Sequence, residues 1–501
     1  MALHVAQLSA IPATTAVVAV LSAAILYAVA RGVYNVFLHP LAKVPGPKLY
    51  AVSDVFYIYH LTHGNWPQTL KVLHDQYGPV VRFAPTEVSF VSVGAWKDIY
   101  GHKNDISRNY PKCDKAVPPS LSGVPNLLTA NDADHRRMRK LLSHAFSEKA
   151  LRSQESTMNR YIDLFINKLT DAADRREPMD MVKWFNFLTF DLIGDLAFGE
   201  PFGGLESGSY HPWVSMIFSS VRMTTLTQVF RRHPILQPIA RLLTPRKVMK
   251  DVQEHWQLSQ ETALRRINSK DSAERNDFMS YILRYNDEKG MSQGEIIENT
   301  NILIIAGSET TATTLSGTTY LLATNPDAYH KLVKEIRSTF TSEEDITLAR
   351  VGNLEYMRAV FDETFRMYPP VPIGLPRIVP QGGDFIEGYW MPPGTAVSVP
   401  QWPAYQSDKL WTDPQEFIPE RWLGDERFAN DARGILQPFS VGPRNCIGMN
   451  LAHAETRLIL ARMLWRFDIQ LRSDSINWKQ QPIYTLWDKG ELNVKISLAQ
   501  R

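Results

Sequence analysis

Cys446 is the residue whose surroundings point most clearly to chemistry, and the chain has only one other cysteine, Cys113. It comes just before the stretch 450–467, whose apolar periodicity predicts a long helix. Backbone N–H groups and the helix dipole favour an anion at a helix N-terminus, so we expect a lowered thiol pKa and a thiolate at Cys446. A thiolate can ligate a metal. We interpret Cys113 as a structural or incidental thiol.

The neighbours of Cys446 suit a flat ligand that carries acidic groups. Gly442 and Gly448 let the backbone turn tightly and approach a ligand closely. Phe439 can cover one side of the sulfur, and Arg444 can neutralise a carboxylate. An iron porphyrin meets all these requirements, because it takes one axial thiolate, presents a planar apolar face and carries propionates. An isolated cysteine would more often be a small buried apolar residue.

The spacing of these five residues resembles the haem-binding signature of the cytochrome P450 family, F-x-x-G-x-R-x-C-x-G, at every specified position. The resemblance implies that Cys446 is the axial ligand of the iron in haem b, iron protoporphyrin IX. It further implies a haem-thiolate monooxygenase with the cytochrome P450 fold, which is mainly α with minor β and forms a single large haem domain.

A second segment resembles the family's distal helix, which faces the iron from the other side. The stretch 296–315 reads as a helix and contains Ala306-Gly307-Ser308-Glu309-Thr310, which matches the family pattern A/G-G-x-D/E-T. Glycine inside a helix costs about 1 kcal/mol relative to alanine, so it calls for a reason such as close approach to a ligand. The resemblance implies room for dioxygen at Ala306 and Gly307, a hydrogen bond from Thr310, and proton delivery by Glu309. Alone, the segment would read as an ordinary buried helix with a Ser/Thr face.

Glu363 and Arg366 lie three residues apart in a helical run and can pair on one face. Such a pair is more often exposed and weak. The family joins its Glu-x-x-Arg pair to an arginine in a later segment, here Arg421 of Pro419-Glu420-Arg421-Trp422. The resemblance thus implies a buried structural network of Glu363, Arg366 and Arg421 behind the haem.

Three basic or imidazole side chains are candidates for holding the haem propionates. His135 and Arg139 lie four residues apart in the amphipathic run 132–146, so they share a helix face. They resemble the family's Trp/His-x-x-x-Arg propionate element, although the basic residues of this run could equally form a solvated face. Arg377 occupies the place where many members offer another propionate arginine.

The elements that position these residues read mostly as helices. Strand signals at 80–83 and 88–93, and again at 384–386 and 389–391, predict two hairpins. Between these β regions the chain reads mainly as amphipathic helices. We find no fixed-period repeat and no second composition regime, which favours one large soluble domain.

An apolar segment near the N-terminus predicts a membrane anchor. No charged residue occurs from 5 to 30, and 11–30 is long enough to cross a bilayer of about 30 Å. A cleaved secretory signal is the alternative, but no Lys or Arg precedes the run, and it exceeds a usual signal core of about 7 to 15 residues. Basic residues after the segment place the large domain in the cytosol. We therefore divide the chain into a lumenal N-terminus (1–10), a transmembrane anchor (11–30), a basic, proline-rich hinge (31–47) and the haem domain (48–501).

The composition argues against nucleic acid as a partner, because 54 Lys and Arg against 52 Asp and Glu give a net charge of only +2. Segments 39–47 and 191–199 resemble microsomal fungal members of specialised metabolism. The resemblance implies an endoplasmic reticulum enzyme that uses O2 to oxidise an apolar small molecule, such as a terpenoid or polyketide. We find no G-x-G-x-x-G motif after a strand, so we expect electrons from a separate protein. The resemblance implies that this donor is a membrane-bound, NADPH-dependent diflavin reductase.

Two other functions remain open at this point. One is a thiolate-haem isomerase or dehydratase that needs neither O2 nor a reductase. The other is a haem protein that senses gas or carries electrons without catalysis. Glu309 and Thr310 argue against the first, since proton delivery would be dispensable there, and the small Ala306-Gly307 pair argues against the closed pocket expected for the second.

Overall fold

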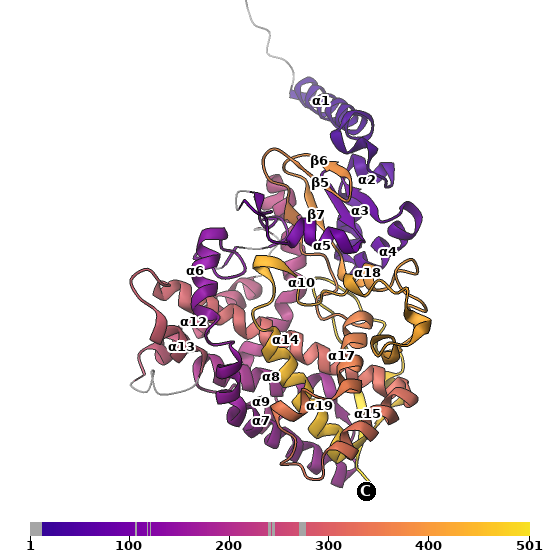
Figure 1. Ribbon diagram of the computed structural model, residues 1–501. Helices are drawn as coiled ribbons and strands as arrows, with labels where there is room; N and C mark the ends of the chain where they lie inside the picture. Colours follow the sequence, from indigo (N-terminus) through magenta and orange to yellow (C-terminus); the bar gives the residue numbers. More distant parts are fainter. Residues whose placement is uncertain are drawn as a thin grey trace, which may run out of the picture.

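The computed structural model describes residues 13–105, 108–117, 119–120, 122–238, 242, 246–269 and 277–500. Helix α14 (Gln293–Thr324) runs through the middle of the helical body (Figure 1). It packs against α8 (Met181–Phe198), α17 (Glu355–Met367) and α19 (Met449–Arg466). Apolar side chains of these helices form the main core. The helix predicted at 296–315 is therefore the central element of the fold.

Further helices surround this centre, and their ends follow ordinary capping rules. A capping box of Ser292 and Glu295 begins α14, and the side chain of Asn131 caps the helix that carries His135. The longer surrounding helices in chain order are α4 (Trp66–Tyr77), α5 (Val93–Tyr100), α6 (Asp132–Leu142), α7 (Glu148–Arg175), α10 (Pro212–Arg232), α12 (Arg246–Ile267), α13 (Phe278–Tyr285) and α15 (Pro326–Thr339).

The strands form small sheets at the edges of the helical body. A four-stranded sheet has the order β1-β2-β7-β4, in which β2 and β7 are parallel and the other neighbours antiparallel. The hairpin of β5 and β6 has the predicted bounds, and its turn uses Glu387 and Gly388 at positive φ. The strands are β1 (Val80–Ala84), β2 (Glu87–Phe90), β3 (Met179–Asp180), β4 (Arg377–Ile378), β5 (Asp384–Ile386), β6 (Tyr389–Met391), β7 (Ala396–Ser398), β8 (Phe467–Leu471) and β9 (Asn493–Leu498). The predicted class, mainly α with minor β, is confirmed.

Helix α1 (Ala13–Val33) projects from the body beside α2 (Lys48–Val52) and α3 (Val55–Thr62), at the end opposite the C-terminus (Figure 1). The helical stretch Thr14–Leu38 is long and apolar enough to cross a membrane. It continues past Ala30, so the first part of the predicted hinge is helical rather than irregular. The predicted lumenal residues 1–10 lie outside the described residues.

Candidate active site

Cys446 lies in a tightly constrained loop just before α19. Its backbone N–H donates to the carbonyl oxygen of Phe439 over 2.8 Å. Gly442 has a φ of +75°, and a Cβ there would collide with the carbonyl oxygen of Tyr100. The loop therefore requires glycine at position 442.

The side chain of Cys446 is accessible to water. Burial of the loop nevertheless raises the pKa of the thiol, and the N–H of Gly448 and the charge of Arg139 oppose this rise without cancelling it. The prediction of a lowered thiol pKa is thus wrong for the protein alone, because the loss of solvation outweighs the effect of the helix end. A metal cation at the sulfur would stabilise the thiolate directly.

One strip of α14 is open to water although the helix is central. Ala306 is exposed and Thr310 is half-buried, whereas Ser308 and Glu309 are buried. The Thr310 hydroxyl donates to the carbonyl oxygen of Ala306 over 2.6 Å. This strip lies on a helix that packs against α8, α17 and α19.

Gly307 lies against a neighbouring helix. A Cβ at this position would lie 2.9 Å from Cδ1 of Ile193 on α8. The missing side chain therefore lets two helices pack closely. The structure explains Gly307 by this helix contact, and the approach of a ligand at this residue stays a prediction.

Glu309 is buried and forms an ion pair with Lys489, a residue that the sequence did not connect with it. Proton delivery by Glu309 stays a prediction, and Lys489 is the cation that lies beside it.

Two arginines near the cysteine loop are buried with incomplete partners. Arg444 donates to Asp132 over 2.7 Å and to the carbonyl oxygen of Ala130 over 2.8 Å, but its Nη1 is buried without a partner. Arg377 is only 5% exposed, and in the described part of the chain it pairs with no carboxylate. Burial, assisted by the charge of Arg444, lowers the pKa of Arg377 to about 10.

Lys112 completes this group of cations and was missed in the sequence. An antiparallel bridge pairs Lys112 with Arg377, and the Lys112 Nζ donates to the carbonyl oxygen of Leu128 over 2.5 Å. Burial and the charges of Arg377 and Arg444 lower the pKa of Lys112 to about 6. Arg377 and Arg444 thus carry more positive charge than Asp132, the carboxylate that pairs with this group in the described part of the chain, balances.

His135 and Arg139 share a face of α6, but they make different contacts. His135 is buried, and burial together with Arg444, Lys112 and Arg139 lowers its pKa to about 3, so the imidazole is neutral at neutral pH. Arg139 donates to the backbone oxygen and to Oδ1 of Asn445, each over 2.6 Å. Here Arg139 holds the Cys446 loop, and its contact with a propionate stays a prediction.

These residues fit an iron porphyrin. The accessible sulfur of Cys446 would hold the iron, and the orphaned buried N–H groups of Arg444, with Arg377 and Lys112, would hold the two carboxylates. When bound, the haem supplies the activation of dioxygen. The chain supplies a small exposed side chain at Ala306 and a hydroxyl at Thr310 that can donate or accept a hydrogen bond.

The predicted network of Glu363, Arg366 and Arg421 is present, and all three side chains are 0% exposed. Arg366 donates to Glu363 over 2.7 Å, and Arg421 does so over 3.0 Å. The Trp422 indole N–H donates to the other Glu363 oxygen over 3.0 Å. The charges are thus mutually satisfied, as burial requires.

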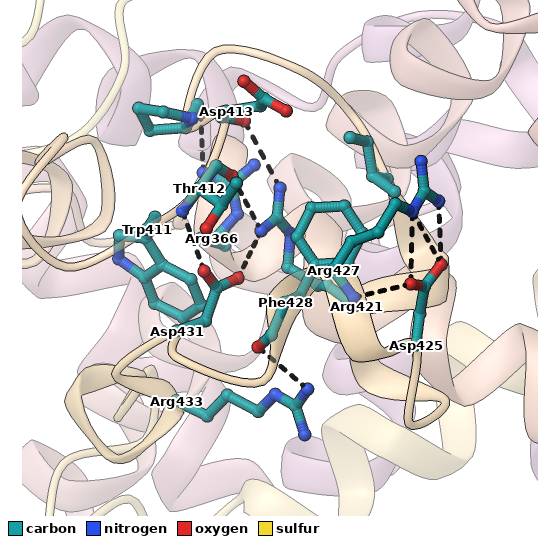
Figure 2. A network of polar contacts seen from close by, with 12 residues as sticks. Arg366, Trp411, Thr412, Asp413, Arg421, Asp425, Arg427, Phe428, Asp431 and Arg433 are labelled. Atoms are coloured by element: carbon teal, nitrogen blue, oxygen red, sulfur yellow. Dashed lines mark hydrogen bonds and ion pairs between the residues drawn. The ribbon is translucent and has the colours of Figure 1, made fainter.

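Asp431 extends this network and was not predicted. It pairs with Arg421, which also donates to the carbonyl oxygens of Thr412 and Asp413 (Figure 2). The second Asp431 oxygen accepts from the backbone N–H of Thr412 over 2.8 Å. Asp431 therefore ties the loop after Trp411 to the buried arginine.

Glu455 is a further buried acid that the sequence analysis missed. It lies on α19, and burial raises its pKa to about 8 despite a hydrogen bond with Thr311 of α14. A glutamate inside the apolar stretch 450–467 was the available signal. No comparable local signal marks Lys112, Asp431 or Lys489, because their partners are distant in sequence.

Comparisons with known proteins agree with this geometry. The cytochrome P450 family matches residues 45–493. Cytochrome P450 monooxygenase aclL of Aspergillus oryzae is 45% identical over 94% of this chain and 96% of its own length. Cytochrome P450 monooxygenase efuB of Hormonema carpetanum is 42% identical over 95% of both chains. The trichothecene C-4 hydroxylase of Trichoderma arundinaceum is 42% identical over 93% of this chain and 94% of its own.

The chain belongs to the cytochrome P450 family. It is a haem-thiolate monooxygenase that uses O2 and receives electrons from a redox partner. This confirms the predicted enzyme class. The isomerase or dehydratase alternative is not favoured, since these relatives are monooxygenases or a hydroxylase.

Proposed function

We propose that this enzyme holds haem b through Cys446 and inserts one oxygen atom into an apolar small molecule of secondary metabolism. One O2, one NADPH and one proton are consumed, and they give the oxidised product, one water and NADP+. A terpenoid or polyketide intermediate is the proposed substrate class, in keeping with a relative named as a trichothecene C-4 hydroxylase. Thr310 and Glu309 are proposed to deliver the protons that end up in the water molecule.

The observation that carries this proposal is that the central helix α14 is not buried at Ala306 and Thr310, in a fold whose Cys446 is also accessible to water. The same helix is buried at Ser308 and Thr311. A small side chain and a hydroxyl on such a strip leave room for dioxygen and offer a hydrogen bond to it.

An NADPH-dependent diflavin reductase is the proposed electron donor. A surface hollow beside the Cys446 loop is lined by basic residues, among them Lys103, Arg136 and Arg139. Lys140 lines a neighbouring hollow. These side chains can attract an acidic partner surface. Arg444 was also expected to help, but it is turned inward to Asp132 and is 8% exposed, so it is not part of this surface.

The proposed location is the endoplasmic reticulum membrane, with a single pass and a cytosolic catalytic domain. The helix Thr14–Leu38 supports an anchor because it is apolar, long and only 6% buried. Arg31 lies in the C-terminal part of this helix, and Lys43 and Lys48 follow it, which supports the cytosolic side for the domain.

Metabolite profiling of a host with and without the enzyme, followed by assay of the accumulating compound, tests this function. Microsomes with the enzyme, reductase, NADPH and 18O-labelled dioxygen should give a product with one labelled oxygen atom. An unlabelled rearranged or dehydrated product formed without NADPH would instead identify an isomerase or dehydratase.

A further inference from the structure

The ion pair of Glu309 and Lys489 lies in the interior next to the proposed oxygen site. The two side chains are 5% and 4% exposed, respectively, and Lys489 Nζ donates to Glu309 Oε1. The same Nζ donates to the Thr313 hydroxyl over 2.6 Å, and this hydroxyl donates to Glu309 Oε1 over 3.3 Å. Glu309 Oε2 is buried and has no hydrogen-bond partner.

The position of Lys489 is fixed from both sides by its own loop, which joins β8 to β9. The backbone N–H of Asp488 donates to the carbonyl oxygen of Pro482 over 2.9 Å, and the Trp478 indole donates to the carbonyl oxygen of Gly490 over 2.8 Å. Trp487 stacks on Tyr368 with ring centroids 4.2 Å apart. These contacts hold the loop so that the ammonium group of Lys489 reaches α14.

The geometry of α14 directs the carboxylate. Residues four apart lie nearly above each other on a helix, so Glu309 and Thr313 form one strip while Ala306 and Thr310 form the adjacent strip. Lys489 and Thr313 hold Oε1 in the first strip. The second oxygen remains free to accept or deliver a proton without breaking the pair.

We infer that Lys489 is the positioning residue that holds Glu309 by Oε1 and leaves Oε2 for proton transfer on the Thr310 side of α14. This inference rests on the proposed oxygen chemistry at Thr310. A buried carboxylate without a cation favours its protonated form, which cannot take up a further proton from solvent. Among the described residues, Tyr210 and Tyr368 are the other titratable groups that interact with Glu309. Both are neutral phenols at neutral pH, so Lys489 supplies the positive charge.

The test compares Lys489→Met, Lys489→Arg and Glu309→Gln in the holoenzyme with reductase. The measured quantity is product formed per NADPH consumed between pH 6 and 9, together with the infrared absorption of protonated carboxyl groups. Lys489→Met should lower this ratio about tenfold at neutral pH, recover it as the pH rises, and add one carboxyl band. Lys489→Arg should stay near the parent enzyme, because it retains the cation.

The double variant Glu309→Gln/Lys489→Met removes both charges and carries the test if Lys489→Met does not fold. It should have the pH profile of Glu309→Gln alone and lack the added band. Lys495→Met on β9, an exposed lysine, is the matched control and should change nothing. An unshifted profile and no new band in Lys489→Met, or a double variant that differs from Glu309→Gln, would overturn the inference. If the parent enzyme formed no product at all, the proposed function itself would fail, while the infrared comparison would still report on Lys489.

Discussion

At the scale of single residues, the clearest feature is the surplus of positive charge beside the Cys446 loop. Burial is the main reason that the pKa of Lys112 is lowered to about 6 and that of Arg377 to about 10. The charge of Arg444 adds to both shifts, and the charge of Arg377 adds to that of Lys112. Cations are costly in such a place unless an anion balances them. The two propionates of a haem would provide that balance.

Replacing Lys112 tests this balance directly. A hydrogen bond between charged groups contributes about 1.5 kcal/mol, so Lys112→Met should release haem about tenfold faster. Transfer of haem to an excess of apomyoglobin measures the rate. Lys112→Arg should retain most of the parent behaviour, and Lys115→Met, an exposed charge in the same segment, should have no effect. Equal release rates in all of these proteins would show that Lys112 does not face the propionates.

At the scale of elements, buried acids fasten helices and loops to one another. Asp431 fixes a loop to Arg421, and Glu455 joins α19 to α14 through Thr311. Glu455 thus holds α19, the helix that follows Cys446, and Asp431 holds the loop after Trp411.

The contribution of Asp431 can be measured against an exposed pair in the same region. Asp431→Asn breaks a buried pair with Arg421, and we expect a loss of about 3 to 5 kcal/mol in the free energy of unfolding. Asp425 pairs with Arg427 (Figure 2). The Arg427 side chain is 67% exposed, so Asp425→Asn should change stability little. Urea denaturation of the two variants provides the comparison, and similar losses would contradict a structural role for the buried pair.

Glu455 predicts a pH dependence of stability. Burial raises its folded-state pKa from 4.5 to about 8, so the folded chain keeps a proton that the unfolded chain releases between these values. The contribution of this group is therefore fully favourable below about pH 4.5 and is lost as the pH rises through 8. Glu455→Gln cannot ionise, so it should match the parent protein at pH 5 and exceed its stability at pH 8 by on the order of 4 kcal/mol. Urea denaturation at both pH values measures this, and a difference that does not change with pH would contradict it.

The sequence predicted those elements whose signals are local. The hairpin of β5 and β6 has its predicted ends because alternation and the Glu387-Gly388 turn lie within a few residues. The contact of Gly307 with Ile193 was not predicted, because a pattern cannot tell which neighbour a helix face meets. Contacts such as Lys489 with Glu309 join distant segments and leave no pattern in the sequence.

At the scale of the whole molecule, the fold separates the apolar helix α1 from the central helices of the body. Helix α1 projects at one end beside α2 and α3, while α14, α17 and α19 form the helical body beyond them (Figure 1). The absence of repeats and of a second composition regime favoured a single large domain, the resemblance implied the same, and the family match covers residues 45–493. The site residues come from segments far apart in sequence, so only a folded chain can hold the iron.

The most direct test of this account is the absorption spectrum of the reduced, carbon monoxide-bound protein. The purified enzyme should show the absorption that is typical of thiolate-ligated haem, and Cys446→Ser should lose that band. A parent protein without haem, a spectrum typical of nitrogen ligation, or a thiolate band that persists in Cys446→Ser would contradict the assignment of Cys446 as the iron ligand.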